Sequence, residues 1–598
     1  MLDTIAKLVP QKTVSGRYKP PWITREVKRL IRKKQRAYNR AKKTNRDSDW
    51  CIFRSLRKEA QKAMKQAHWD YVNSLFEKDD NDKGLWRYLK GMRKNACGVS
   101  TLTSKGKTAV DPKDKAEMLN KQFSSVFTRE ESSNVPNLGE SPYPEMPSII
   151  VGEPGVLKLL RELKTNKASG ADGIPAVVLK NCAAELAPML TFIIQQSIDS
   201  KEVPADWKEA IVSPIFKKGN RSDPANYRPV SLTAICCKVS EHIITSETLR
   251  HLDQNKILKD IQHGFRKKHS CETQLLITTH DIASILNNQS QVDVAVLDFA
   301  KAFDKVPHLR LLEKLRYYNL DANVIGWIKS FLSNRSQRVV VDGFQSEDAP
   351  VLSGVPQGTV LGPLLFLIFI NDISEDLESI VRLFADDCVL YREIKSQADV
   401  EALQRDLDKL IKWSKSWGME FNIDKCYLLS ITLAKKRKIS SEYTMDGKKV
   451  KPVQSTKYLG VTINNQLKWD EHVENVCGTA SKLLGFLRRT LHKCPEDIKE
   501  KAYKSLVRPR LEYSSSVWDP YKQKHIDKVE MVQRQAARFV KNAPHRMKAD
   551  QPSVTAMVKD LGWETLQSRR KTGRLTMLYK ITNELVAMPH HYHPRPQP

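Results

Sequence analysis

The sequence lacks several features that define common protein classes. Its longest strongly apolar run, residues 363–370 (PLLFLIFI), is far shorter than the roughly 20 residues of a membrane-spanning helix. Residues 1–12 contain no apolar core of signal-peptide length. None of the ten cysteines forms a Cys-x-x-Cys pair, so neither a disulfide framework nor a zinc knuckle is expected. We therefore expect no membrane partner, reduced thiols, and a location in the nucleus, the cytoplasm or both.

Acidic residues are too few to balance the basic ones. The 598 residues include 99 Lys and Arg against 69 Asp and Glu, a formal net charge of +30. The first 100 residues hold 26 Lys and Arg and 10 Asp and Glu, a net charge of +16. Such asymmetry is typical of a protein that binds a polyanion, most often nucleic acid or an anionic membrane face.

The pattern along the chain predicts several parts. Residues 22–69 form a basic helical region in which Trp and Tyr are interleaved with Lys and Arg. These aromatic side chains could stack on bases or pack on a neighbouring helix; we favour packing for the aromatic residues and nucleic-acid contact for the basic ones. Residues 151–435 alternate between helical and strand-like segments, as in an α+β or α/β domain, and the chain beyond Gly460 is largely helical.

The segment QVDVAVLDFAKAFDKV (291–306) predicts a strand that ends in a carboxylate. Val292, Val294 and Val296 alternate with Asp293 and Ala295, which favours a strand. Asp298 follows that strand, before a turn that enters a helix. A carboxylate at a strand end can be a metal ligand, although by itself it is more often a helix cap or an ion-pair partner.

The segment LFADDCVLY (383–391) places two adjacent aspartates in an apolar, strand-like run. Strand, tight turn and strand fit this pattern, with Asp386 and Asp387 at the tip of a hairpin. If the strand that precedes Asp298 lies alongside, three carboxylates converge, and hard divalent cations would relieve their repulsion. Two such ions could activate a hydroxyl and stabilise the leaving oxygen of a phosphoryl transfer. Taken alone, two adjacent aspartates indicate a solvated β-turn; the apolar flanks and the second carboxylate-bearing strand favour the metal site.

A turn-rich loop lies between these two segments. SGVPQG (353–358) has glycines that let a ligand approach the backbone closely. The apolar run that follows has helical length and stops at Asn371 and Asp372. Such a loop could position a base pair or a nucleotide beside a metal site, whereas an ordinary turn is the alternative.

In this order, DFAKAFD, SGVPQGTVLGPLLF and FADD resemble the motifs of reverse transcriptases of non-LTR retrotransposons, in particular jockey-like LINE elements. Further similar segments lie on both sides: KASGADGIP (167–175), NYRPVSLT (226–233), QHGFRKKHSCETQL (262–275), FLSNRSQRVVVDG (331–343) and KYLGVTI (457–463). Thr359 stands where Ser is usual, and Cys271 where Thr is common. The resemblance implies an RNA-directed DNA polymerase, a nucleotidyltransferase that copies an RNA template by adding dNTPs to a primer 3′-OH.

The resemblance also implies a domain plan. It predicts an α+β, right-hand polymerase with fingers, a palm built on an antiparallel sheet, a helical thumb, and helical N- and C-terminal extensions. The expected parts are a basic helical extension (1–127), a linker (128–150), fingers and palm (151–464), thumb (465–545) and C-terminal extension (546–598). The partners would be an RNA template, a DNA primer or target, and dNTPs.

The resemblance further assigns roles to single residues. Asp298, Asp386 and Asp387, together with Phe299, would hold two Mg²⁺ ions, with Mn²⁺ as an alternative. The nucleotide site would contain Lys217 (or its neighbour Lys218), Arg228, Phe303, Gln357 and Gly358, with Phe303 excluding a ribose 2′-OH. Lys425 would protonate the leaving pyrophosphate, although a surface lysine is the plain alternative. Tyr458, Leu459 and Gly460 would form the primer grip.

Alternatives remain at this point. The endonuclease that precedes the polymerase in such elements is absent, so we expect a part of a longer polyprotein or a truncated copy. A catalytically inactive or domesticated nucleic-acid-binding protein is the second interpretation, although it predicts loss of a palm aspartate. A group II intron maturase, a telomerase-like enzyme and a DNA-templated polymerase rank lower.

Overall fold

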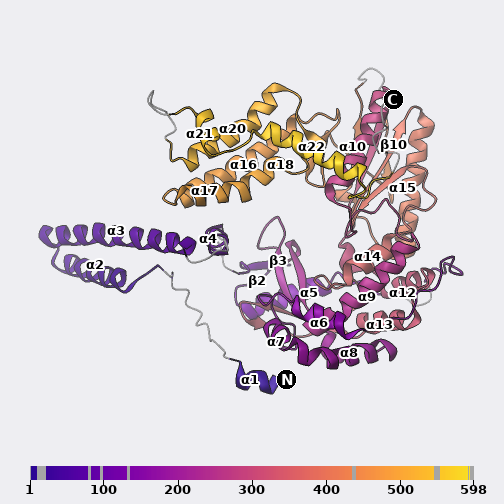
Figure 1. Cartoon of the computed structure of the whole chain (residues 1–598), viewed down its shortest axis with the longest axis horizontal. Helices are drawn as coiled ribbons and strands as arrows, with labels where there is room; N and C mark the ends of the chain where they lie inside the picture. The colour runs from indigo at the N-terminus through magenta and orange to yellow at the C-terminus, as the bar shows by residue number, and fades with distance from the viewer. Residues whose placement is uncertain are drawn as a thin grey trace. The chain divides into compact units, whose positions relative to one another are not determined.

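The computed structural model describes residues 2–9, 20, 22–77, 83–93, 98–130, 135–433, 439–543, 552–589 and 592. Figure 1 labels the helices and strands along the chain, which divides into two compact units by its contacts. Unit 1 comprises residues 3–97 and 470–574, and unit 2 comprises residues 98–469 and 575–598. Residues 98–127, which the sequence grouped with the N-terminal extension, thus belong to unit 2. Helices and strands mix as expected for the α+β class. Among the described helices, none has the length and apolar character needed to span a membrane.

Unit 1 is helical. Its elements are α1 (Leu2–Leu8), α2 (Arg25–Thr44), α3 (Asp47–Glu77), α4 (Lys83–Arg93), α16 (Asp470–Leu491), α17 (Glu496–Ala502), a π-helical turn (Tyr503–Val507), α18 (Arg508–Glu512), α19 (Ser515–Trp518), α20 (Gln523–Val540), α21 (Val554–Asp560) and α22 (Leu566–Thr582), whose last residues belong to unit 2.

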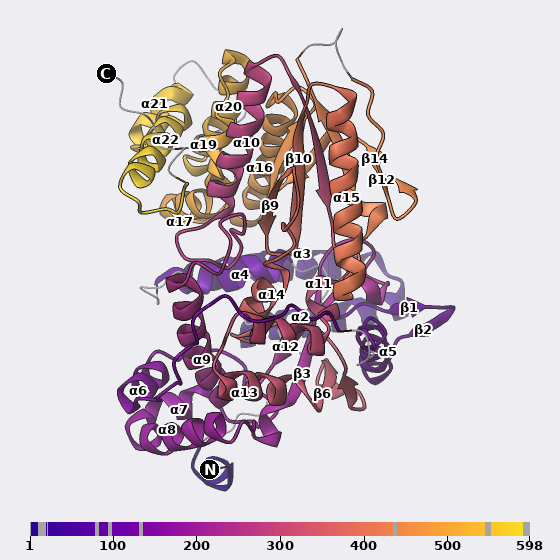
Figure 2. The same ribbon diagram turned by 90° about the vertical axis from the view of Figure 1, so that its right-hand side faces the viewer.

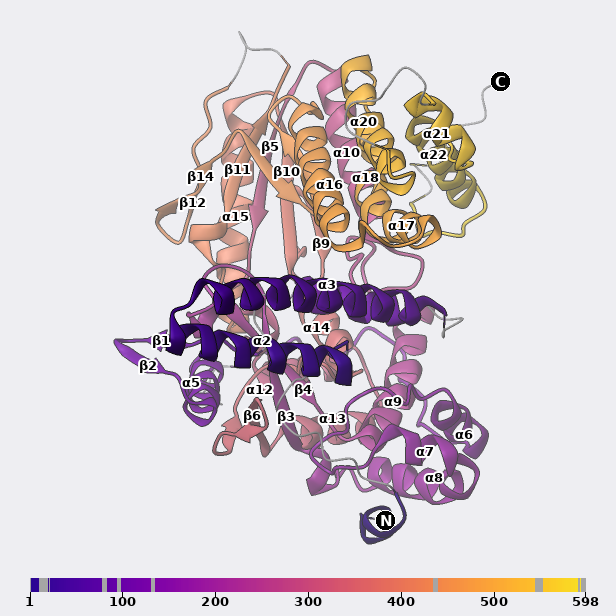
Figure 3. The ribbon, with the colours of Figure 1, turned by 90° about the vertical axis from the view of Figure 1, so that its left-hand side faces the viewer.

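Helices α2 and α3 form a hairpin (Figure 3). Thr24 caps α2 by accepting a hydrogen bond from the backbone of Val27, and Asn45 ends it in the left-handed conformation at φ 51°. The ring of Tyr38 on α2 packs against Trp50 and Phe53 on α3, with centroids 6.2 and 5.3 Å apart. These aromatic side chains therefore pack between helices, which is the alternative that the sequence favoured for them.

Unit 2 contains the strands. Its elements are β1 (Leu102–Ser104), β2 (Lys107–Ala109), α5 (Pro112–Ser124), α6 (Glu153–Arg161), α7 (Ala176–Asn181), α8 (Ala183–Asp199), β3 (Glu209–Phe216), β4 (Tyr227–Leu232), α9 (Ile235–Gln254), α10 (Cys271–Asn287), β5 (Gln291–Leu297), α11 (Ala302–Lys305), α12 (His308–Tyr317), α13 (Ala322–Leu332), β6 (Arg335–Val341), β7 (Phe344–Gln345), β8 (Ala349–Val351), α14 (Gly362–Ile370), β9 (Ile380–Phe384), β10 (Asp387–Ile394), α15 (Gln397–Trp417), β11 (Tyr427–Ile431), β12 (Thr444–Met445), β13 (Lys448–Lys449), β14 (Lys451–Pro452), β15 (Ser455–Tyr458) and β16 (Val461–Asn464).

The main sheet of unit 2 has the order β14–β11–β5–β10–β9, antiparallel except for the β11–β14 pair. Ala295 and Leu297 of β5 join the core that α14 and α15 complete, whereas Val292 and Val294 point to the other face. Helices α10 and α15 lie on either side of these strands (Figure 2). Because both faces are covered, β5 is buried along nearly its whole length.

A second sheet has the order β4–β3–β6–β7, with β8 paired to β6. Strands β3 and β4 are antiparallel, and β3 and β6 are parallel. Helix α5 packs against this sheet, where Leu119 and Phe123 meet Val212 and Val339 in a smaller core. This packing explains why the segment around α5 belongs to unit 2.

A buried lysine joins α12 to the main core. Lys314 has no exposed surface, and its Nζ donates to Asp372 Oδ1 at 2.5 Å and to the carbonyl oxygen of Phe369. Its ammonium lies 3.7 Å from the ring centroid of Trp417 and 5.0 Å from that of Trp413. Burial lowers the pKa of Lys314 to about 8, and Asp372 opposes that shift.

The C-terminal segment of unit 2 is tied to the main sheet. The Tyr592 hydroxyl donates to Asp281 Oδ1 on α10 at 2.6 Å and accepts from Arg382 Nη2 on β9 at 2.8 Å. Arg382 Nη2 also reaches Asp281 Oδ2 at 3.0 Å. The backbone of Ala587 donates to the carbonyl oxygen of Lys268 at 2.9 Å.

Candidate active site

The hairpin of β9 and β10 carries Asp386 and Asp387, as the sequence predicted. Phe384 pairs with Asp387, so Ala385 and Asp386 form a two-residue loop. Ala385 has φ 55°, the positive value that such short loops require to match the strand twist. The loop brings Asp386 to the tip, with Asp387 opening β10.

Asp298 lies beside this hairpin. Strand β5 ends at Leu297, which pairs with Cys388 of β10. Extending this register by one pair sets Asp298 opposite Asp387. The backbone carbonyl of Asp298 accepts from Asn422 N at 2.7 Å, which fixes the strand end against the turn before β11. The predicted approach of the two carboxylate-bearing segments is confirmed.

The three carboxylates influence one another. Burial raises the pKa of Asp387 to about 6, and the neighbouring charges of Asp386 and Asp298 add to the shift. Burial also raises the pKa of Asp386, whereas Lys217 and Arg228 lower it. Within the described ranges, no three His, Cys, Asp or Glu side chains are close enough to form a metal site by themselves. The carboxylate oxygens nevertheless have the donor chemistry that hard divalent cations prefer, and such an ion would relieve their repulsion.

A cavity of about 690 Å³ opens beside Asp298 and Asp386. It is lined by most residues that the sequence singled out: Lys217, Lys218, Arg228, Asp298, Phe299, Phe303, Gln357, Gly358, Asp386 and Lys425. Lys217 and Lys218 follow β3 and Arg228 belongs to β4, so one hairpin supplies the three cations. Burial lowers the pKa of Lys217, as do the charges of Arg228 and Lys218, while Asp386 and Asp298 raise it. An anion bound between these cations would reduce their mutual repulsion.

Lys425 contacts the carboxylate side of the cavity. Its Nζ lies 3.7 Å from Asp298 Oδ2, and both side chains are partly exposed. A short 3₁₀ turn (Ile423–Lys425) presents the lysine. An exposed pair at this distance contributes little to stability, so Lys425 is available to a ligand in the cavity.

Phe303 forms part of the cavity wall. Its ring stacks on Phe366 of α14, with centroids 4.4 Å apart and planes at 19°. Its backbone carbonyl accepts from Val355 N at 2.8 Å, so the loop before α14 also fixes its position. The ring is therefore rigidly held where it meets the cavity.

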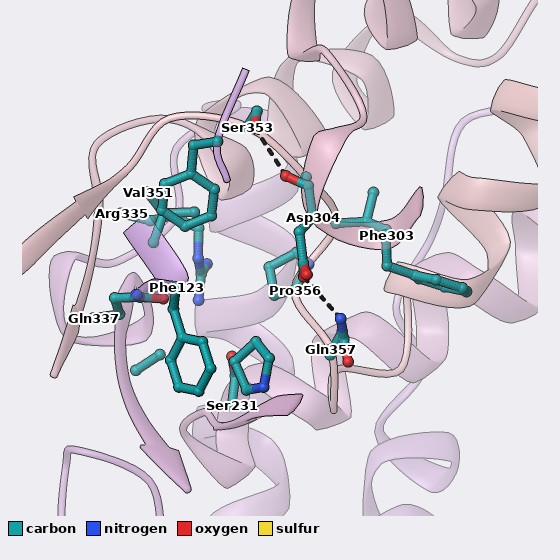
Figure 4. A pocket seen from close by; sticks show the side chains of 15 residues that line it. Phe123, Ser231, Phe303, Asp304, Arg335, Gln337, Val351, Ser353, Pro356 and Gln357 are labelled. Atoms are coloured by element: carbon teal, nitrogen blue, oxygen red, sulfur yellow. Dashed lines mark hydrogen bonds between the residues drawn. The ribbon is translucent and has the colours of Figure 1, made fainter. Parts of the chain in front are cut away.

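The loop of Gln357 and Gly358 is held on both sides. Gln357 Nε2 donates to Asp304 Oδ1 at 2.7 Å, and its backbone carbonyl accepts from Ser231 N at 2.7 Å. Figure 4 shows the hydrogen bond from Gln357 to Asp304. It also shows the bond that Ser353 Oγ donates to the backbone carbonyl oxygen of Asp304, at 2.8 Å. Gly358 has φ 108°, and a Cβ there would lie 2.6 Å from the carbonyl oxygen of Ser231. Only glycine fits this close approach to β4.

The bond from Gln357 also determines how its amide is turned. Asp304 is buried, which raises the pKa of its carboxyl, while the bond from Gln357 lowers it. The amide nitrogen of Gln357 faces Asp304, because Nε2 is the atom that donates to Oδ1. The amide oxygen of Gln357 is then the group left to accept from a ligand.

Residues 215–463 match the family model described as reverse transcriptase (RNA-dependent DNA polymerase), and this range includes every site residue that the sequence singled out. The matched segment makes up about two fifths of the chain and is similar to reverse transcriptases.

Similarity to individual reverse transcriptases extends over most of the chain. The RNA-directed DNA polymerase from mobile element jockey of Drosophila melanogaster is 28% identical over 91% of this chain and 62% of its own length. The probable RNA-directed DNA polymerases from transposons BS and X-element, from the same organism, are 24% and 26% identical over 92% and 87% of this chain. The chain spans about 60% of the length of these relatives. These similarities confirm the resemblance to non-LTR retrotransposon polymerases.

Tyr458, Leu459 and Gly460 lie outside the lining of the cavity. They join β15 to β16 in a two-residue turn, with φ 42° at Leu459 and 89° at Gly460. The Tyr458 side chain is buried, and its hydroxyl accepts from Gln274 Nε2 at 3.3 Å. Burial raises the pKa of Tyr458, and Asp387 contributes to that shift, so this turn lies near the carboxylate hairpin.

Sequence reasoning did not assign Gln262, which braces the carboxylate hairpin. Its Oε1 accepts from Ala385 N at 2.9 Å and from Gly264 N at 2.7 Å. A Cβ on Gly264 would lie 2.3 Å from Ala385 N, so this glycine permits the contact. Phe265, which follows at φ 56°, lines the cavity. In the sequence, QHGF carries only the resemblance to a family motif. The positive φ of Phe265 and the bonds of Gln262 are visible only in the structure.

Proposed function

We propose that this chain is an RNA-directed DNA polymerase, which adds dNTPs to a primer 3′-OH on an RNA template. The supporting observation is the cavity lined by three carboxylates, five cationic side chains and the Gln357 loop, inside the segment that matches the reverse transcriptase family model. In this proposal residues 151–464 form fingers and palm of a right-hand polymerase and residues 465–545 its thumb. The main sheet would be the palm, and the β3–β4 hairpin part of the fingers.

The cations would bind the triphosphate of an incoming nucleotide. Arg228 offers a planar set of donors that suits phosphate oxygens, and Lys217 offers a point charge. Their mutual repulsion falls when the anion enters, so binding and charge relief coincide. Lys425, whose Nζ lies 3.7 Å from Asp298 Oδ2, would donate a proton to the leaving pyrophosphate.

The sugar and base would meet Phe303 and the Gln357 loop. The ring of Phe303 stacks on Phe366 and cannot move aside, so a ribose 2′-OH would clash with it. Gln357 would accept a hydrogen bond from the nucleotide or template through its amide oxygen. Tyr458, Leu459 and Gly460 would support the primer end.

Reverse transcriptases use divalent metal ions, and the donor chemistry here fits them. Asp298, Asp386 and Asp387, with the backbone of Phe299, would hold two Mg²⁺ ions or Mn²⁺. Such ions, when bound, activate the attacking hydroxyl and stabilise the leaving oxygen. The carboxylates position the ions and must be ionised to do so.

Primer extension on poly(rA)/oligo(dT) with Mg²⁺ tests the proposal. Wild-type protein should extend the primer, and Asp298→Asn and Asp386→Asn should each reduce extension by roughly 10²–10³-fold, the range for loss of one positioned electrostatic group from an active site. Asp424→Asn removes an exposed carboxylate next to Lys425 and should leave the rate unchanged. Folded wild-type protein that binds template and primer but does not extend would favour the binding-only interpretation.

A further inference from the structure

Six cationic side chains form one straight line along α2. Arg25, Arg29, Arg32, Arg36, Arg40 and Lys43 follow one another at intervals of three or four residues, and all are exposed. At 100° per residue these positions lie within a narrow sector of the helix surface, and the line is about 27 Å long. Consecutive charges are therefore about one helical turn, ~5.4 Å, apart. We call these six residues the arginine stripe.

The opposite side of α2 is fixed against α3. Val27 and Ala41 are buried on that side, and Tyr38 contacts the rings of Trp50 and Phe53. This packing orients the arginine stripe away from the hairpin interior. It also withdraws the aromatic rings from the basic surface, so the stripe offers charge without a platform for stacking.

The arginine stripe has little internal compensation. Glu26 is the one acidic residue of α2. Among the described residues, the ion pair that involves the arginine stripe is the one between Arg40 Nε and Asp49 Oδ1, 3.1 Å apart. Like charges at i,i+4 destabilise a helix by a few tenths of a kcal/mol per pair, so the free stripe opposes its own helix. A polyanion laid along the stripe would remove that repulsion.

We propose that the arginine stripe binds the phosphodiester backbone of single-stranded RNA, without reading its sequence. Guanidinium groups match phosphate oxygens as bidentate donors, and a line of charges one turn apart can follow an extended strand. RNA is the partner because the proposed function copies an RNA template, so the inference rests on that function. The surface lies in unit 1 and is separate in sequence from all residues of the cavity.

The same hairpin contains a matched control. On α3, the exposed side chains of Arg54, Lys58, Lys62 and Lys65 are also three or four residues apart and opposite the buried Ala60. Replacing these four residues with Gln removes as much charge as replacing Arg25, Arg29, Arg32 and Arg36. Both variants keep the packed side of the hairpin, and circular dichroism should show unchanged helix content.

The experiment measures binding of the full chain to a single-stranded RNA oligonucleotide and to duplex DNA of the same length, between 50 and 300 mM KCl. Four lost phosphate contacts should weaken RNA binding by on the order of 10²-fold at 150 mM salt and reduce the slope of log Kd against log salt by about 3. The α3 variant should weaken binding by less than about fivefold, since bulk charge acts weakly when screened. Replacing the four arginines with Lys should weaken binding a few-fold and keep the slope, because point charges remain.

Equal losses in the α2 and α3 variants, or no loss in either, would overturn the proposal. A loss for duplex DNA as large as that for RNA would overturn RNA as the partner. Extension of a short template–primer should persist in the α2 variant, because its active-site residues are intact. If wild-type protein binds RNA through the stripe but never extends a primer, the proposed polymerase fails and the binding surface stands.

Discussion

Replacing Gln262 with Leu tests how firmly the carboxylate hairpin is held. Gln262 is 2% exposed, and its Oε1 accepts from the buried amide groups of Ala385 and Gly264. Leucine fills a similar volume but offers no acceptor, so two buried N–H groups lose their partner. At about 1–3 kcal/mol for each unsatisfied group, the free energy of unfolding should fall by about 2–6 kcal/mol. Because Ala385 precedes Asp386, the hairpin tip should also shift, and a displacement near 1 Å can reduce a catalytic rate about 10²-fold.

Urea denaturation and single-turnover primer extension measure the two effects. Gln337→Leu is the matched control, because Gln337 is also buried in unit 2. Among the described side chains, its Nε2 donates to Asn120 Oδ1 at 3.1 Å, and this bond does not involve the carboxylate hairpin. We expect a loss near 1 kcal/mol and an unchanged rate for this control. The reasoning is refuted if the two variants unfold at the same urea concentration, or if Gln262→Leu is destabilised but extends primers at the wild-type rate.

Three further predictions concern pH, a buried charge and a glycine. The folded-state pKa of Asp387, about 6, exceeds the value near 3.9 expected in an unfolded chain, so its stabilising contribution is complete below about pH 4 and is lost as pH rises through 6. Mg²⁺ should therefore raise the melting temperature more at about pH 7.5 than at about pH 5, and Asp387→Asn should reduce that difference. Lys314→Met should cost about 3–5 kcal/mol in urea denaturation because Asp372 stays buried without its cation, and adding Asp372→Leu should recover most of it. Gly358→Ala should abolish primer extension, whereas Gly447→Ala, with φ 75° but nothing within 4 Å of its Cβ, should cost only about 1–3 kcal/mol of backbone strain and keep the activity.

The local structure of the segments that carry the candidate site could be predicted from sequence. Alternating valines predicted β5, and the apolar run after the glycine loop predicted α14. Two aspartates inside an apolar run predicted the hairpin, because strand residues on either side left only the aspartates for the turn. These signals depend on periods of two or 3.6 residues, which the chain carries locally.

Contacts between distant segments could not be predicted in the same way. Gln262 lies 123 positions from Ala385 in the sequence, and the spacing of apolar residues near either one does not predict a hydrogen bond between them. Lys314 has the sequence surroundings of an exposed helix residue, yet three aromatic rings enclose it. The two compact units could not be predicted for the same reason. Residues 3–97 and 470–574 form one unit, although residues 98–469 separate them in the sequence. The roles of the single site residues stay predictions until variants are measured.

The bond between Tyr592 and the main sheet has a practical consequence for anyone who expresses this protein. Tyr592 covers the carboxylate of Asp281 and contacts Arg382, which lies four residues before Asp386. Removing seven or more residues at this end would take Tyr592 away and leave the ion pair of Arg382 and Asp281 without the two hydrogen bonds that Tyr592 makes. An affinity tag is therefore better placed at the N-terminus, and inactivity of a protein that lacks Tyr592 would not test the proposed roles of Asp298, Asp386 and Asp387.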